Sequence, residues 1–260
     1  MLLAVDVGNT NISMGVMEGD KIRSSFRLIT KTERSSDELG IVVYDLLNRA
    51  GIGPQDIDDI VISSVVPALM YTLNSCMKKY LGKTPIVINS EIEAGVKLCA
   101  DNPKAVGADR IVDCAYAFHT YHRSCIIVDF GTATTFDYVN DHGEFKYTVI
   151  SPGLGISAAA LTSQTAKLPE IEIAKPASVL GTNTISGMQA GVVYGYIGLV
   201  EYILKQMKKE LHDEDCMVVA TGGLGRVIAN ETDMIDVYDP DAAYKGIRII
   251  YELNKNRKSE

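Results

Sequence analysis

The stretch that decides the fold is LLAVDVGNTNISMGV, residues 2–16. Residues 2–7 are apolar apart from Asp6, and Gly8 opens a polar turn before a second, largely apolar run. This pattern predicts a strand, a tight turn and a second strand. Residues 22–28 alternate between apolar and polar side chains, which predicts a third strand.

The opening pattern returns at residues 125–135, which read CIIVDFGTATT. An apolar run again ends in an aspartate, a glycine and a threonine, and Asp129 follows Asp6 by 123 residues. A repeat at this interval predicts two similar α/β domains with a ligand cleft between them. We place the first domain at residues 1–118 and the second at 119–260.

Helical periodicity and helix start signals occur after each predicted hairpin. The expected helices cover about residues 35–50, 66–80, 108–119, 156–166, 186–211 and 242–254. Apolar strands are expected at residues 57–63, 85–88 and 216–220. Strands that alternate with helices after each hairpin are typical of mixed sheets flanked by helices.

The composition excludes several classes of protein. The 260 residues contain 47% hydrophobic side chains, so neither disorder nor a fibrous architecture describes the whole chain. Lys and Arg total 25 against 33 Asp and Glu, and the net charge of −8 argues against nucleic acid as a partner. The basic residues Lys255, Arg257 and Lys258 of the tail are expected to be solvated.

The expected location is the cytoplasm. The N-terminal apolar stretch lacks a basic leader and is interrupted by Asp6, unlike a signal peptide. No apolar run approaches the roughly 18 residues of a spanning helix. The lack of such a run predicts no membrane association. The five cysteines are odd in number and form no CxxC pair, which favours a reducing compartment.

Three glycine-rich turns are candidates for nucleotide binding. Residues 6–10, DVGNT, offer a backbone that a phosphate can approach closely at Gly8, with amide and hydroxyl donors around it. Asp6 would need a cation or water between itself and a phosphate, so it is a candidate for organising a metal ion. Residues 129–135 repeat this arrangement, and residues 221–225, TGGLG, would let a base or ribose lie against the backbone.

Each turn also has a plain structural interpretation, as a hairpin or as the end of a strand. The sequence contains no GxxxxGK[ST] motif and no GxGxxG after a strand, which excludes two common nucleotide-binding loops.

The three motifs, in this order, resemble the phosphate 1, phosphate 2 and adenosine motifs of the superfamily of acetate and sugar kinases, heat-shock chaperones and actin. More narrowly, the chain resembles type III pantothenate kinases. The residues that carry this match are DVGNT at 6–10, GADR at 107–110, DFGTATT at 129–135 and GTNT at 181–184, with additions at 168–169 and 195–201. The resemblance implies two ribonuclease-H-like, or actin-like, domains.

The family phosphorylates pantothenate with ATP to give 4'-phosphopantothenate, the first step of coenzyme A synthesis. The resemblance implies that Asp109 accepts the proton of the attacking hydroxyl, and that Gly107, Ala108, Asp109 and Arg110 contact pantothenate. A carboxylate at that point could accept a hydrogen bond from an alcohol, and Arg110 could hold an anionic group. Without the resemblance, GADR reads as the start of a helix with an acidic residue in its first turn.

The same resemblance assigns the other ligands. ATP would contact the following residues of the two hairpins: Asp6, Val7, Gly8, Asn9, Thr10, Asn11, Ile12, Ser13 and Thr132. Asp129 would bind a monovalent cation, K⁺ or NH₄⁺, and Mg²⁺ would come with ATP through Asp6 or water. Thr184 would reach pantothenate across a homodimer interface.

One departure and two alternatives stay open. The family usually carries Tyr in the segment before Asn-Pro, where this chain has Ala100. If that Tyr packs on the substrate, the substrate site of this chain is roomier. A kinase of another small alcohol could use the same scaffold. A non-catalytic nucleotide-binding accessory protein is the other alternative, against which stand the intact Asp6, Asp109 and Asp129.

Overall fold

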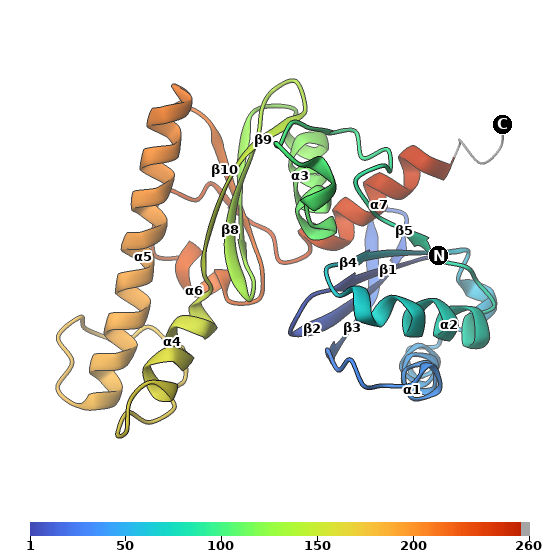
Figure 1. Cartoon of the computed structure of the whole chain (residues 1–260), viewed down its shortest axis with the longest axis horizontal. Helices are drawn as coiled ribbons and strands as arrows, with labels where there is room; N and C mark the ends of the chain where they lie inside the picture. The colour runs from blue at the N-terminus through green and yellow to red at the C-terminus, as the bar shows by residue number, and fades with distance from the viewer. Residues whose placement is uncertain (256–260) are drawn as a thin grey trace. The chain divides into compact units, whose positions relative to one another are not determined.

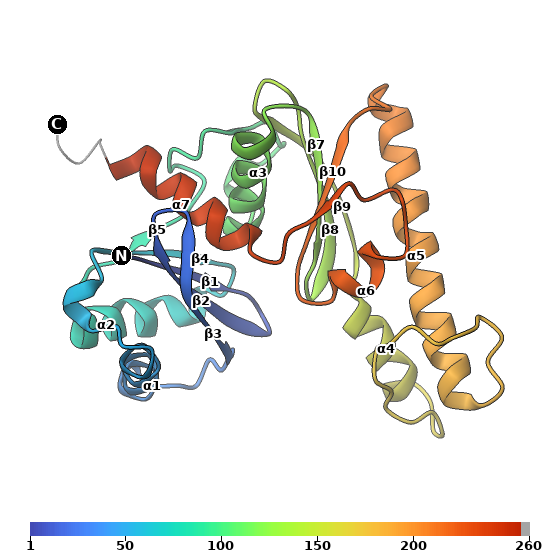
Figure 2. The same ribbon diagram turned by 180° about the vertical axis from the view of Figure 1, so that it is seen from behind.

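The computed structural model describes residues 1–255, so Arg257 and Lys258 of the basic tail lie outside the described residues. The chain forms two compact units. The first contains Met1–Thr120 together with the segment from Asp241, and the second contains Tyr121–Pro240. Figures 1 and 2 trace the chain through both units, which are described separately below.

A mixed sheet forms the centre of the first unit. Its strands lie in the order β3-β2-β1-β4-β5, with β1 antiparallel to β2 and parallel to β4. The bounds are β1 Leu2–Val7, β2 Asn11–Glu18, β3 Lys21–Ile29, β4 Asp59–Ser64 and β5 Ile86–Val87. The three-stranded hairpin expected from residues 2–28 is therefore observed, and the parallel β4 follows after a helix.

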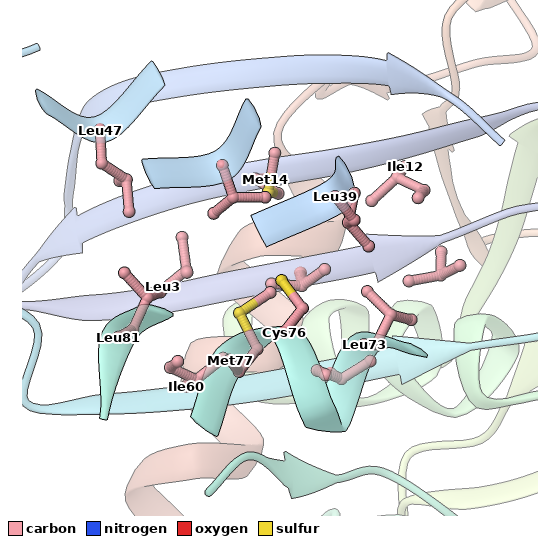
Figure 3. Packing of buried hydrophobic residues seen from close by; sticks show 14 of the residues in the cluster. Leu3, Ile12, Met14, Leu39, Leu47, Ile60, Leu73, Cys76, Met77 and Leu81 are labelled. Atoms are coloured by element: carbon pink, nitrogen blue, oxygen red, sulfur yellow. The ribbon is translucent and has the colours of Figure 1, made fainter. Parts of the chain in front are cut away.

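Two helices cover one face of this sheet, α1 Ser36–Arg49 and α2 Met70–Leu81. Ser35 caps α1, because its hydroxyl accepts from the Glu38 amide while the Glu38 carboxylate accepts from the Ser35 amide. Odd-numbered side chains of β1, such as Leu3, pack with apolar residues of both helices (Figure 3). Burial of this cluster holds the helices on the sheet.

The opposite face carries α3 Ala108–Tyr121 and α7 Ala242–Lys255. The expected division assigned α7 to the second domain, but the helix packs in the first unit. The reason is its apolar face: Ile247 and Ile250 are fully buried against the even-numbered face of β1, which includes Ala4. Short elements complete this unit: η1 Pro54–Asp56, η2 Pro67–Leu69, β6 Lys97–Leu98 and η3 Pro103–Ala105.

The second unit repeats the pattern of hairpin and parallel strand. Strands β11, β10, β7, β8 and β9 lie side by side in this order, with β7 antiparallel to β8 and parallel to β10. Their bounds are β7 Cys125–Phe130, β8 Ala133–Val139, β9 Glu144–Pro152, β10 Met217–Thr221 and β11 Val237–Tyr238. The helices are α4 Leu154–Ser163, α5 Thr184–Leu211 and α6 Gly225–Ala229.

The predicted fold class is confirmed: two similar α/β units, each with a mixed sheet flanked by helices. In both units the aspartate is the penultimate residue of the first strand and lies in register with a hydroxyl residue of the second strand, Asp6 with Ser13 and Asp129 with Thr135. Within residues 1–255, no helix has both the length and the apolar character needed to cross a membrane.

Candidate active site

The turn between β1 and β2 exposes its central residues, Asn9 and Thr10. The Gly8 amide donates to the Asn11 carbonyl oxygen at 2.9 Å, which closes the turn. Thr30, just after β3, supports it twice: its amide donates to the Thr10 carbonyl (2.9 Å) and its hydroxyl to the Gly8 carbonyl (2.7 Å). The turn is thereby held in one shape, with polar groups available to a ligand.

Two of the expected ATP contacts, Val7 and Ile12, have their side chains in the core. Both are at most 2% exposed and belong to the cluster that packs under α1 and α2. Any contribution that they make to a nucleotide site must come from their backbone groups. Asn11 and Ser13, in contrast, are partly exposed on β2.

Asp6 has the most strongly perturbed carboxyl group of this turn. Burial, and after it the negative charge of Asp109, raise the pKa of Asp6 from 3.8 to about 7. A contact with the hydroxyl of Ser63, which is buried without another hydrogen-bond partner among the described residues, lowers the pKa and offsets part of this rise. Asp6 therefore lies in an environment that favours a neutral carboxyl or a nearby cation.

The GADR segment begins α3 beside the first turn. The Arg110 amide donates to Asp109 Oδ1 at 2.8 Å. A β-carbon at Gly107 would lie 2.4 Å from that oxygen and 3.3 Å from Val65, so the carboxylate needs a glycine at this position. The Val65 amide in turn donates to the Val7 carbonyl at 3.1 Å, which ties the segment to the end of β1. Ala108 is buried and anchors the helix start.

In the second unit, the carboxylate of Asp129 is enclosed by two glycines. A β-carbon at Gly131 would lie 3.1 Å from Asp129 Oδ2, and one at Gly222 would lie 2.5 Å from Oδ1. Gly222 has φ +92°, a conformation that side chains rarely adopt. The glycines of the second and third motifs thus meet around one aspartate.

The neighbouring Thr132 is exposed, and its carbonyl oxygen accepts from the Gly153 amide at 3.1 Å. In the same part of the second unit, the Tyr196 hydroxyl donates to the Pro152 carbonyl (2.9 Å) and lies 2.6 Å from the hydroxyl oxygen of the buried Thr134. These bonds fix the β8–β9 end of the second hairpin against α5. Thr184 is exposed in the first turn of α5, next to the capping residue Asn183.

The sequence as a whole matches a known protein family. The model of the type III pantothenate kinase family matches residues 2–206. The chain belongs to this family. A type III pantothenate kinase of Agathobacter rectalis is 50% identical over 258 residues, which cover 99% of each chain.

Solved structures support the fold alone. A structure described as a Baf family transcriptional activator from Campylobacter jejuni covers 98% of this chain and 99% of its own, with 19% identity and a TM-score of 0.62. A ROK family glucokinase from Streptomyces griseus, in complex with glucose and AMPPNP, gives a TM-score of 0.52 at 11% identity, with 98% and 99% coverage. The type III pantothenate kinase family thus shares its architecture with sugar kinases.

For this member of the type III pantothenate kinase family, the fold brings Asp6 and Asp109 together and groups Asp129 with Gly131 and Gly222. Sequence reasoning missed two residues that support the first site, which consists of the DVGNT turn and Asp109. Ser63 is a fully buried polar residue directly after the apolar residues 60–62 of β4, a signal that was available. Tyr244 of α7 packs on Gly15 and hydrogen-bonds Ser13, and no local pattern pointed to it.

A divalent ion that arrives with a nucleotide is compatible with the Asp6–Asp109 pair. Within the described residues, no cluster of three or more His, Cys, Asp or Glu side chains could hold a metal ion by itself. The Asp6–Asp109 pair nevertheless favours a cation, because two neighbouring carboxylates repel each other when both are ionised. Mg²⁺ commonly combines one or two carboxylates with phosphate oxygens and water, which suits this arrangement.

Proposed function

We propose that the chain transfers the γ-phosphoryl group of ATP to pantothenate, giving 4'-phosphopantothenate at the start of coenzyme A biosynthesis. The observation that carries this proposal is the pairing of Asp109 with Asp6 beside the exposed DVGNT turn. Phosphoryl transfer needs a positioned nucleotide, charge neutralisation and a group that orients the acceptor hydroxyl. The first unit supplies candidates for each need.

In this proposal, Asp109 accepts the proton of the pantothenate hydroxyl. At the start of α3, the Arg110 amide donates to this carboxylate and helps to fix its orientation. Gly107, Ala108 and Arg110 contact the substrate, with the Arg110 guanidinium suited to an anionic group.

The nucleotide is proposed to lie against residues 6–13 of the first unit. Amides and hydroxyls at Asn9 and Thr10 suit phosphate oxygens, because donors in a tight turn converge on one point. Mg²⁺ bound to ATP would be organised by Asp6, directly or through water, and would supply charge neutralisation. Asp129 is proposed to hold a monovalent cation, K⁺ or NH₄⁺, since its carboxylate is enclosed by glycine backbone.

A homodimer is proposed through α5, with Thr184 reaching the substrate of the partner. Gly187, Gly191, Gly195 and Gly198 leave space on this helix. Apart from their chain neighbours and the nearby backbone of the helix itself, no atom of the described residues lies within 4 Å of a β-carbon built at any of them. Exposed Ile185 and Tyr202 lie on the same helix. Such a surface permits close contact with the same helix of a second copy.

We propose the cytoplasm as the location.

The experiment is a phosphorylation assay with ATP-Mg and pantothenate, with and without K⁺ or NH₄⁺. The proposal expects 4'-phosphopantothenate as the product, and turnover that depends on the monovalent cation. Other small alcohols serve as competing acceptors at equal concentration. Preferred phosphorylation of another alcohol would replace the substrate assignment, and ATP binding without any turnover would favour the accessory-protein alternative. Light scattering tests the dimer, which a monomer at assay concentration would contradict.

A further inference from the structure

A row of polar residues crosses four neighbouring strands of the first unit. Asp6 of β1 lies in register with Ser13 of β2 on one side and with Ser63 of β4 on the other. Ser13 lies in register with Arg27 of β3. Since residues paired across strands project to the same face of a sheet, Arg27, Ser13, Asp6 and Ser63 share one face.

Arg27 is the cation of this row and has no assigned role. The residue is exposed on the edge strand β3, and within residues 1–255 its guanidinium takes part in no hydrogen bond or ion pair. The position of Arg27 is therefore not explained by an ion pair with a carboxylate of the described residues. An exposed, unpaired guanidinium retains all its donors for a ligand.

The C-terminal helix places Tyr244 beside Arg27. Helix α7 packs on β1, β2 and β4, and the Tyr244 ring lies against Gly15, where a β-carbon would be 2.9 Å from the ring. The Tyr244 hydroxyl hydrogen-bonds Ser13 and is close enough to Arg27 and Asp6 for both charges to act on it. The buried Tyr244 ring thus covers part of the polar row, and the exposed Arg27 lies at the end of the row.

The row also leads to the nucleotide turn. Ile29, two residues after Arg27 and on the same face, lies in register with Asn11 at the start of β2 and is 63% exposed. The next residue, Thr30, bonds to Gly8 and Thr10 of the turn. Strand spacing of about 4.8 Å puts the Arg27 backbone about 10 Å from that of Asp6, a span for a long side chain and a phosphate group.

The charges around Arg27 indicate which kind of ligand it would bind. Asp6 and Asp109 cannot neutralise a triphosphate, and the chain as a whole carries −8. An arginine fork matches two phosphate oxygens, and its hydrogen bonds to a charged acceptor are stronger than those between neutral groups. We propose that Arg27 binds the triphosphate of ATP, next to Ser13. This inference rests on the proposed function, because it takes the turn at residues 6–13 as the nucleotide site.

The test compares Arg27→Gln and Arg27→Lys with the wild type in two assays: direct binding of adenosine, ADP and ATP-Mg, and steady-state kinetics with pantothenate. Arg27→Gln is expected to weaken ATP-Mg binding by about 10- to 100-fold, the usual range for losing charge-assisted hydrogen bonds. ADP is expected to lose less, adenosine nothing, and KM for pantothenate to change less than twofold. Arg27→Lys should recover part of the ATP affinity.

Arg23→Gln is the matched control, since Arg23 is an exposed arginine on the same strand, four residues further from the turn. It should leave ATP-Mg binding within twofold of the wild type. Equal losses for adenosine and ATP, or equal losses in the Arg23 and Arg27 variants, would overturn the inference. If the wild type turns over and Arg27→Gln binds ATP as tightly as the wild type, the inference is also overturned. A wild type that binds no ATP would instead refute the proposed function.

Discussion

The carboxyl groups of Asp6 and Asp109 interact although their residues are 103 positions apart in the chain, and the charge of Asp109 raises the pKa of Asp6. The pair lies where the end of β1 meets the start of α3. Full ionisation of both groups is unfavourable in the unliganded protein, and a cation arriving with ATP would relieve the repulsion. The relationship thus couples the proposed base to the proposed nucleotide site.

We predict that Asp109→Asn lowers kcat by at least about 100-fold, because loss of general base catalysis commonly costs 10²- to 10⁴-fold. Asn is nearly isosteric, so the start of α3 should persist. ATP binding measured by calorimetry should stay within a few-fold of the wild type. Unchanged turnover would remove Asp109 from the base role.

Asp6→Asn should stabilise the unliganded protein in a pH-dependent way. The pKa of Asp6 is raised from 3.8 to about 7 in the folded state, so the folded protein binds this proton more tightly than the unfolded chain. The wild type therefore loses stability as the pH rises from about 4 to about 7, and the variant does not. The gain in unfolding free energy should grow from under about 1 kcal/mol at pH 4 to as much as about 4 kcal/mol at pH 8, at about 1.4 kcal/mol per pKa unit.

Denaturant unfolding at several pH values, without nucleotide, measures this effect. In Asp109→Asn, the additional gain from Asp6→Asn should shrink, since one source of the raised pKa is gone. A gain that is the same at pH 4 and pH 8 would contradict the prediction.

Gly222→Ala should destabilise the second unit by about 2 kcal/mol or more. The added β-carbon would lie 2.5 Å from Asp129 Oδ1 and 2.6 Å from the Phe130 backbone, at a φ of +92°. Thermal unfolding measures the loss. Gly155→Ala in α4 is the control, because its β-carbon would meet only Leu224 at an ordinary 3.9 Å, and alanine favours a helix. Equal melting temperatures for the two variants would be inconsistent with this account.

Tyr196→Phe should cost about 1 to 2 kcal/mol of unfolding free energy. The change removes the hydroxyl that bonds the Pro152 carbonyl and the buried Thr134, while the ring keeps its place beside Phe130. The exposed Tyr202 of the same helix offers the control Tyr202→Phe, which should leave the melting temperature unchanged. A similar loss in both variants would point to the helix itself.

Local patterns were sufficient to predict the hairpins, because strands, turns and their acidic ends are encoded within about fifteen neighbouring residues. They also predicted α5, although it begins at Thr184, two residues before the expected start. They were insufficient for α7, since amphipathic periodicity shows that a helix has an apolar face and not which sheet will bury it. The short β6 and β11 were missed because two residues carry no periodicity and, unlike those of β5, they do not lie in a longer apolar run.

The sequence by itself therefore determined the repeated aspartate-glycine hairpins, the alternation of helix and strand, and the family to which the chain belongs. Only the tertiary structure decided that Asp109 acts on Asp6, that Gly222 closes on Asp129, and that Arg27, Ser13, Asp6 and Ser63 share one row. The physical reason is that local conformation follows from neighbouring residues, whereas strand register and helix docking come from burying apolar faces contributed by distant parts of the chain.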